Sequence, residues 1–159
     1  MDLDTDHHVV LCVPGFPQSL EDADKPFLLS HAQALLSAGF EVTVVAPALP
    51  RAPKRQVIEG VEVLRVRYAP RRLETLAATG SMYREARGLK ALLVLPMLFS
   101  MVATTIRQLR RSSAVAYGHW WIPGGVVAVA GAWFSRRPSI VHLHGSDTEV
   151  ARGPIMRKF

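Results

Sequence analysis

The sequence has few of the features that identify secreted, disulfide-bonded or membrane-spanning proteins. Its 159 residues include one cysteine, Cys12, so an intramolecular disulfide cannot form. The N-terminus, MDLDTD, is acidic, and the apolar run that follows is stopped at Pro14, whereas a secretory signal needs a basic start and a longer apolar stretch. The longest apolar segment, residues 91–106, is shorter than the about 20 residues that span a bilayer. These absences predict a cytoplasmic protein with a buried, unreactive thiol.

Motifs of nucleotide-binding loops and common hydrolases are also missing. The stretch PGFPQS, after the first apolar run, has neither the dinucleotide-binding nor the P-loop spacing, and no nucleophile elbow occurs. His142, His144 and Asp147 are clustered potential metal ligands, but their spacing matches no recognised metal motif. We therefore expect no metal, and we interpret His142, which lies inside an apolar run, as a core histidine.

The composition fits one globular domain, because the chain is 49% hydrophobic and 20% charged. Its net charge of +6 is unevenly distributed. Residues 1–50 contain seven acidic and one basic side chain, a net charge of −6, whereas residues 51–159 contain eighteen basic and six acidic, a net charge of +12. Such a field favours anionic partners, but the basic residues lack the interleaved aromatics of nucleic-acid sites, so we do not expect nucleic acid.

The first fifty residues predict a strand, a helix and a second strand. Residues 8–13 and 41–47 are apolar on both faces, as in a parallel sheet. Between them, Asp24 can cap a helix, Pro26 suits its first turn and Gly39 ends it. Leu28, Ala32, Leu35 and Leu36 share one face of that helix. This βαβ unit indicates an α/β fold.

The stretch QVIEGVEVLRVRY predicts a short and a longer strand joined by a turn at Gly60. Its apolar residues (Val61, Val63 and Val66) alternate with polar ones (Glu62, Arg65 and Arg67). We therefore expect this strand near a sheet edge, with the polar set facing water.

Residues 91–106 allow three interpretations. A helix buried against the sheet and kinked at Pro96 is favoured over a helix at a membrane surface, and both over a transmembrane span. The membrane-surface interpretation rests on the flanking basic residues, which include Lys90 and Arg107.

The remaining chain predicts a strand over AVAYGHWW, a helix beginning at Pro123, and a strand over SIVHLHGSD with its exit turn. The whole pattern predicts a three-layer α/β/α Rossmann-like domain with a mostly parallel twisted sheet. Ligands of such sheets bind at the carboxyl ends of the strands. Three stretches reach that edge, namely PGFPQ, GHWWIPGG and HGSD. Gly124 and Gly125 lie at the N-terminus of the predicted helix, where an anion is favoured.

The order EVTVVAP, EGVEVLRV, GHWWIPGG and IVHLHGSD resembles the N-terminal half of family 4 glycosyltransferases, over nearly the whole chain. These are two-domain enzymes of the GT-B fold. The resemblance implies transfer of a sugar from a nucleotide-sugar to an acceptor, usually with retention and without a metal. It also implies that residues 1–159 hold the acceptor and form an incomplete N-terminal domain. The nucleotide-sugar, a co-substrate rather than a cofactor, binds a C-terminal domain that this chain lacks, and the isolated chain is expected to be inactive.

The resemblance also implies roles for particular residues. His144 matches the histidine near the transferred sugar, and Asp147 is the second expected catalytic residue, a carboxylate that orients a hydroxyl. The expected substrate-binding residues line the same cleft: Gly15, His119, Trp120, Gly124, Gly125, Gly145 and Ser146. One departure concerns the first loop, where many relatives have two adjacent glycines and this sequence has Gly15 alone.

The sequence therefore predicts the acceptor-side half of a retaining glycosyltransferase that acts on a glycan or lipid-linked acceptor. Its expected location is the cytoplasm, with possible peripheral contact at the inner face of the membrane. The alternative is a freestanding, non-catalytic module that binds an anionic glycan or lipid.

Overall fold

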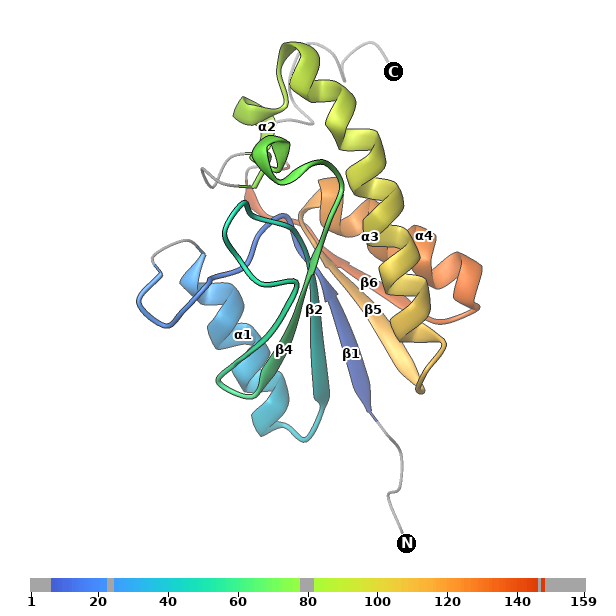
Figure 1. The fold of residues 1–159 in the computed structure, drawn as a ribbon. Helices are drawn as coiled ribbons and strands as arrows, with labels where there is room; N and C mark the ends of the chain where they lie inside the picture. The colour runs from blue at the N-terminus through green and yellow to red at the C-terminus, as the bar shows by residue number, and fades with distance from the viewer. Residues whose placement is uncertain (1–6, 23–24, 78–81, 146, 148–159) are drawn as a thin grey trace, which may run out of the picture.

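The protein is a six-stranded sheet between two layers of helices (Figure 1). The computed structural model describes residues 7–22, 25–77, 82–145 and 147. The spatial order of the strands is β3-β4-β2-β1-β5-β6, and every neighbouring pair is parallel except the antiparallel β3–β4 hairpin. The strands are β1 (His8–Cys12), β2 (Glu41–Pro47), β3 (Arg55–Ile58), β4 (Val61–Val66), β5 (Ala114–His119) and β6 (Ser139–His142). This architecture confirms the predicted Rossmann-like α/β class.

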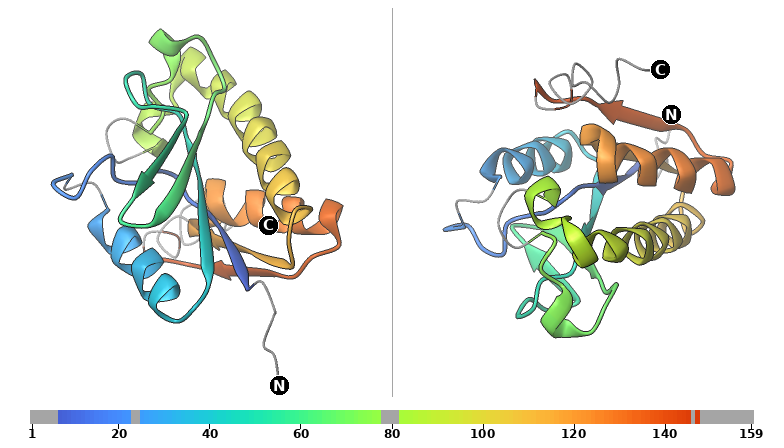
Figure 2. Two further views of the ribbon diagram at one scale, coloured as in Figure 1. Left: turned by 60° about the horizontal axis from the view of Figure 1, so that its bottom comes forward. Right: turned by 90° about the horizontal axis from the view of Figure 1, so that it is seen from above.

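Helices cover both faces of the sheet (Figure 2). Helix α1 (Pro26–Ser37) packs on one face, where its Leu28 and Ala32 meet alternate residues of β1 and β2. Helices α3 (Val94–Leu109) and α4 (Val126–Ser135) pack on the opposite face, against the other set of strand residues. Because successive side chains of a strand point to opposite faces, the nearly all-apolar strands supply both cores.

The ends of α1 agree with the sequence pattern. Pro26 is its first residue, where a missing backbone N–H costs nothing, and Gly39 follows its end with φ +89°. Asp24, the predicted cap, lies outside the described residues. Leu35 and Leu36 are partly buried against the same core as Leu28 and Ala32, which confirms the predicted apolar face.

The prediction that Arg65 faces water is wrong. Arg65 is only 3% exposed, and its Nη2 atom donates hydrogen bonds to the carbonyl oxygens of Phe16 and Pro17, at 3.0 and 2.7 Å. Arg65 lies two residues beyond Val63 and therefore shares its face, beneath α1. The guanidinium reaches from that core to the loop after β1 and fixes the path of that loop.

Helix α3 is buried along one stripe only. Met97, Met101, Thr105 and Leu109 recur every four residues and pack against the sheet and α4. Pro96 lies in the first turn of α3 instead of kinking its middle, and the 3₁₀ helix η2 (Gly88–Leu93) precedes it. By length and composition alone, the segment Gly88–Leu109 is long and apolar enough to cross a membrane. Only 17% of its most apolar 18-residue stretch is buried inside the protein.

Short elements join β4 to η2, namely the 3₁₀ helix η1 (Arg71–Leu73) and the single turn α2 (Met82–Glu85). Within this connection Glu74 is fully buried, and its carboxylate accepts hydrogen bonds from Arg67 Nε and from the backbone N–H of Tyr68. These bonds explain how a carboxylate is tolerated there, since a buried charge needs partners.

We predict that Arg65→Met lowers the free energy of unfolding by about 2 kcal/mol, because Met keeps the side-chain length but leaves two buried carbonyls without a donor. Arg72→Met is the matched control, since Arg72 is exposed, and it should change stability by less than about 0.5 kcal/mol. Urea unfolding followed by circular dichroism measures both values. Equal stability of the two variants would contradict the structural role of Arg65.

Candidate functional site

The candidate site forms where β5 and β6 end beside the start of α1. The parallel register pairs His119 with His142, and His144 lies two residues beyond. Helix α1 closes the site from the other side through two aromatic side chains one turn apart. The ring of Phe27 lies 5.7 Å from Trp120 and 5.6 Å from His144, and His31 sets its edge against His119 at 5.0 Å. The predicted site edge is therefore the place where these residues meet.

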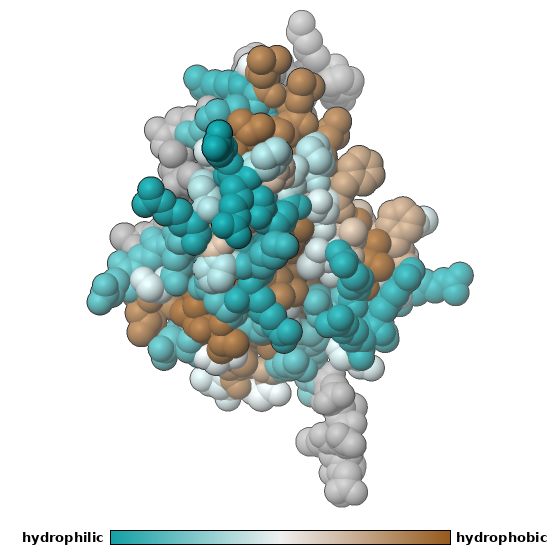
Figure 3. Space-filling model, in the orientation of Figure 1, coloured by the Kyte–Doolittle hydropathy of each residue, from teal (hydrophilic) through white to brown (hydrophobic). Residues whose placement is uncertain are grey.

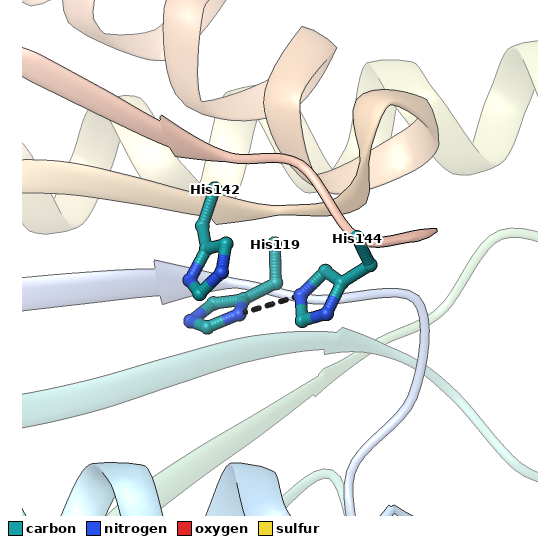
Figure 4. Close-up of side chains that lie close together, drawn as sticks. All are labelled: His119, His142 and His144. Atoms are coloured by element: carbon teal, nitrogen blue, oxygen red, sulfur yellow. Dashed lines mark hydrogen bonds between the residues drawn. The ribbon is translucent and has the colours of Figure 1, made fainter. Parts of the chain in front are cut away.

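His119 is the buried centre of this cluster. Its side chain is 2% exposed, and its Nδ1 atom lies 3.1 Å from Nε2 of His144, a hydrogen bond in which one nitrogen donates and the other accepts (Figure 4). Its other nitrogen, Nε2, has no hydrogen-bond partner among the described residues. Burial, reinforced by His31, His144 and His142, lowers the pKa of His119 to about 3. The imidazole is therefore neutral at pH 7.

His144 is held on three sides. Trp120 stacks on its ring at a centroid distance of 4.1 Å, and His119 binds its Nε2 atom. Its backbone N–H donates to Oδ2 of Asp147 at 2.9 Å, and the backbone N–H of Asp147 donates back to the His144 carbonyl at 2.9 Å. Burial and then His142 lower the pKa of His144, against the opposing effect of Asp147. His144 is thus a positioned imidazole whose neutral form is favoured.

Asp147 stabilises the backbone of the turn that contains His144. The residue is 3% exposed, and one carboxylate oxygen is used by the His144 N–H, while Oδ1 has no partner among the described residues. A carboxylate that accepts a backbone N–H fixes a turn much as it caps a helix. Asp147 therefore holds His144 in place, and one of its oxygens remains for a further hydrogen bond.

His142 is not the core histidine that the sequence suggested. It is exposed at the end of β6, an edge strand whose four residues are all exposed. Its ring stacks on His144 at 4.6 Å and 9°, and its Nδ1 atom lies 3.4 Å from the hydroxyl oxygen of Tyr117. Burial of a strand residue depends on what covers the sheet face, which an apolar run alone does not reveal.

Sequence reasoning missed His31 and Tyr117. His31 lies edge-on against both Tyr117 and His119, and burial lowers its pKa. One signal was present, because Phe27 and His31 are four residues apart and must share a face of α1. Tyr117 lies two residues before His119 on β5, so the two rings share a face of the sheet and stack at 4.8 Å.

The glycines predicted to bind substrate have different surroundings. Gly124 and Gly125 end the turn η3 (Trp120–Gly125), and α4 begins at Val126, three residues after the predicted start at Pro123. Both are buried, however, and a Cβ atom at Gly124 would lie 2.1 Å from the His119 carbonyl oxygen and 2.5 Å from that of Cys12. Glycine is needed at 124 because the turn packs on the ends of β1 and β5.

The loop after β1, which contains Gly15, and the loop after β6, which contains Gly145, differ in burial. Gly15 is buried, next to Phe16, whose carbonyl accepts the hydrogen bond from Arg65. Gly145 is exposed, with nothing within 4 Å of a Cβ atom built on it. Ser146 lies outside the described residues. The exposed rim of the site is therefore formed by His142, Gly145 and the partly exposed Trp120.

Comparison with known proteins gives one family. The family described as glycosyl transferase 4-like domain matches residues 25–158, which include every predicted site residue except Gly15. Curated proteins give no significant match. The match confirms the resemblance that rested on the GHWWIPGG and HGSD stretches.

We predict that Gly124→Ala lowers the free energy of unfolding by at least about 2 kcal/mol, because the new methyl group meets backbone atoms that cannot move aside. Gly145→Ala is the matched control, since the same methyl group meets open space there and should change stability by less than about 0.5 kcal/mol. Thermal unfolding measures both variants. A Gly124→Ala protein as stable as the wild type would show that the turn does not pack as described.

Proposed function

Because the chain belongs to the family of glycosyl transferase 4-like domains, we propose that it is the acceptor-side half of a retaining glycosyltransferase. In this proposal a sugar passes from a nucleotide-sugar to a glycan or a lipid-linked acceptor. The nucleotide-sugar is a co-substrate held by a second domain, and no resident cofactor takes part in the transfer. The observation that best supports the proposal is the His119–His144 pair at the open carboxyl edge of the sheet.

His144 is the proposed catalytic residue. Its Nε2 atom is engaged by His119, so Nδ1 is the nitrogen that we expect to meet substrate. A neutral imidazole with a proton on Nδ1 donates a hydrogen bond to the sugar or to the leaving oxygen, where negative charge develops. Trp120 fixes the ring of His144 and Asp147 fixes its backbone. His144 therefore loses little further conformational entropy when it meets the substrate.

Asp147 is proposed to help in two ways. Through Oδ2 it positions His144, and through Oδ1 it accepts a hydrogen bond from an acceptor hydroxyl and orients it. The proposed substrate-binding residues are those that line the same edge: Gly15, His119, Trp120, Gly124, Gly125, Gly145 and Ser146. Gly124 and Gly125 contribute by shaping the turn, because the backbone at these two residues is packed against the neighbouring strands.

We predict that His144→Ala lowers kcat by about a hundredfold or more, which is the effect of losing one donor to developing charge in a closed site. The assay joins the chain to the nucleotide-sugar domain of a glycosyl transferase 4-like enzyme, fused or added in trans, and measures sugar release and transfer. The chain alone should give no transfer above background.

His7→Ala is the matched control, because His7 is exposed and lies at the opposite end of the sheet. It should leave kcat unchanged. Melting temperatures of both variants separate catalysis from folding. If His144→Ala kept full activity with a lowered melting temperature, His144 would be a structural residue. The alternative, a freestanding non-catalytic module that binds an anionic glycan or lipid, would then gain support.

We also propose that the protein lies in the cytoplasm and binds peripherally to the anionic inner face of the membrane. Its basis is the outer side of η2 and α3, where Leu89, Leu92, Leu95 and Phe99 are 61–86% exposed. In Figure 3 apolar side chains gather at the end of the molecule formed by these elements, and hydrophilic side chains cover the neighbouring centre. Exposed apolar surface beside basic residues is typical of proteins that lie on a bilayer.

The neighbouring pocket supplies the positive charge. A pocket of about 470 Å³ lies between β4 and α3, and the cationic residues that line it include Lys54, Arg67, Arg107 and Arg111. Arg65 lines it too, but its guanidinium is engaged by the loop after β1. Arg107 and Arg111 are exposed on α3 or directly after it, and no salt bridge involves either among the described residues. Such a pocket suits a lipid phosphate, and each basic residue near a membrane adds about 1 kcal/mol of attraction.

We predict that the double variant Arg107→Glu and Arg111→Glu abolishes flotation of the chain with vesicles that contain anionic lipid, at low salt. Phe99→Ser should weaken flotation as well, because it removes exposed apolar surface. Lys25→Glu, a charge reversal beside α1 on the other face of the sheet, is the control and should still float. Equal binding of the wild type to neutral vesicles, or resistance to high salt, would argue for insertion instead.

A further inference from the structure

Three histidines of the site lie close enough to share one ion. His119 comes from β5, His142 from β6, and His144 from the segment directly after β6, and their ligand nitrogens all lie within 4.8 Å of one another (Figure 4). We propose that His119, His142 and His144 form a binding site for a divalent transition-metal ion such as Zn²⁺. The ligand set differs from the sequence candidates, because buried His119 replaces Asp147, whose Oδ2 atom is used by the turn.

The spacing fits a tetrahedral ion. Zinc binds imidazole nitrogens at about 2.0–2.1 Å, so two nitrogens on one tetrahedral ion are about 3.3 Å apart. Nδ1 of His119 and Nε2 of His144 are already 3.1 Å apart. The third ring, His142, is stacked on His144 and must tilt so that Nε2 points at the ion while Nδ1 stays near the Tyr117 hydroxyl. It can do so without moving the backbone, because its side chain is exposed at the sheet edge.

Two further observations support a metal. His119 is 2% exposed, yet its Nε2 atom has no hydrogen-bond partner among the described residues, so the ring can exchange its tautomer without breaking a second bond. The hydroxyl of Tyr117 lies 3.4 Å from Nδ1 of His142. A partner on one ring nitrogen fixes the tautomer that leaves the other nitrogen free for a metal.

The donor set selects the class of ion. Imidazole nitrogens suit Zn²⁺, Cu²⁺, Ni²⁺ and Co²⁺, whereas Mg²⁺ and Ca²⁺ need oxygen ligands. Three protein ligands leave a fourth position for water or another small ligand. The inference goes beyond sugar transfer, which needs no metal in our proposal. An ion held by Nε2 of His144 would replace the hydrogen bond from His119 and leave free Nδ1, the nitrogen that we expect to meet substrate.

The test uses the 159-residue chain without an affinity tag, titrated with Co²⁺ and Zn²⁺. We expect one Co²⁺ per chain, with visible absorption bands of a tetrahedral site that Zn²⁺ displaces. Cu²⁺ should quench tryptophan fluorescence, because Trp120 stacks on His144. His142→Ala should weaken binding by more than about tenfold, since even loss of a residue that only orients a ligand has that effect.

Two variants refine the test, and one serves as a control. His142→Cys keeps a metal-binding side chain and should retain the ion, and Tyr117→Phe should weaken binding through the lost orienting hydroxyl even if His142→Ala proves unstable. His7→Ala removes a histidine outside the cluster and should leave binding unchanged. Absence of Co²⁺ binding to the wild type, or equal binding by wild type, His142→Ala and Tyr117→Phe, would overturn the proposal. Neither result bears on sugar transfer, which is measured separately.

Discussion

The close approach of Gly124 to the ends of β1 and β5 is the contact on which the site depends. A backbone can pack at that distance only where no side chain intervenes, and a Cβ atom at Gly118 on the facing strand would also clash, at 2.5 Å from the Gly124 carbonyl oxygen. The turn is therefore folded tightly over the strand ends. It buries His119 beneath it and brings Trp120, at φ +62°, onto the ring of His144.

The site differs from the rest of the molecule in its charge. The chain has a net charge of +6, yet burial and mutual repulsion keep the imidazoles of His31, His119 and His144 toward their neutral forms. Neutral imidazoles donate and accept hydrogen bonds without adding charge, and they are the form that binds metals. The basic surface can therefore attract an anionic partner, while the three imidazoles at the site carry little positive charge of their own.

Much of this could be predicted from the sequence, because the signals are local. Apolar strands, the Pro26 and Gly39 boundaries of α1, and the edge where GHWWIPGG and HGSD meet all follow from short patterns. The failures depend on contacts between distant segments. Arg65 is buried because the loop after β1 offers it carbonyl oxygens, and His142 is exposed because among the described residues no element covers that edge of the sheet. Neither the partners of Arg65 nor the exposure of His142 can be predicted from the residues next to them in the sequence.

The topology also links the two proposals about function. Strands β1, β2, β4, β5 and β6 run in the same direction, so β4 delivers the chain to the edge where His119 and His144 lie. The connection from β4 through η1, α2 and η2 stays at that end before α3 runs back along the sheet (Figure 1). The exposed leucines of η2 and of the first turn of α3 thus belong to the same end of the molecule as the histidines. Under these two proposals, an acceptor anchored in a bilayer would meet the site without leaving the membrane surface.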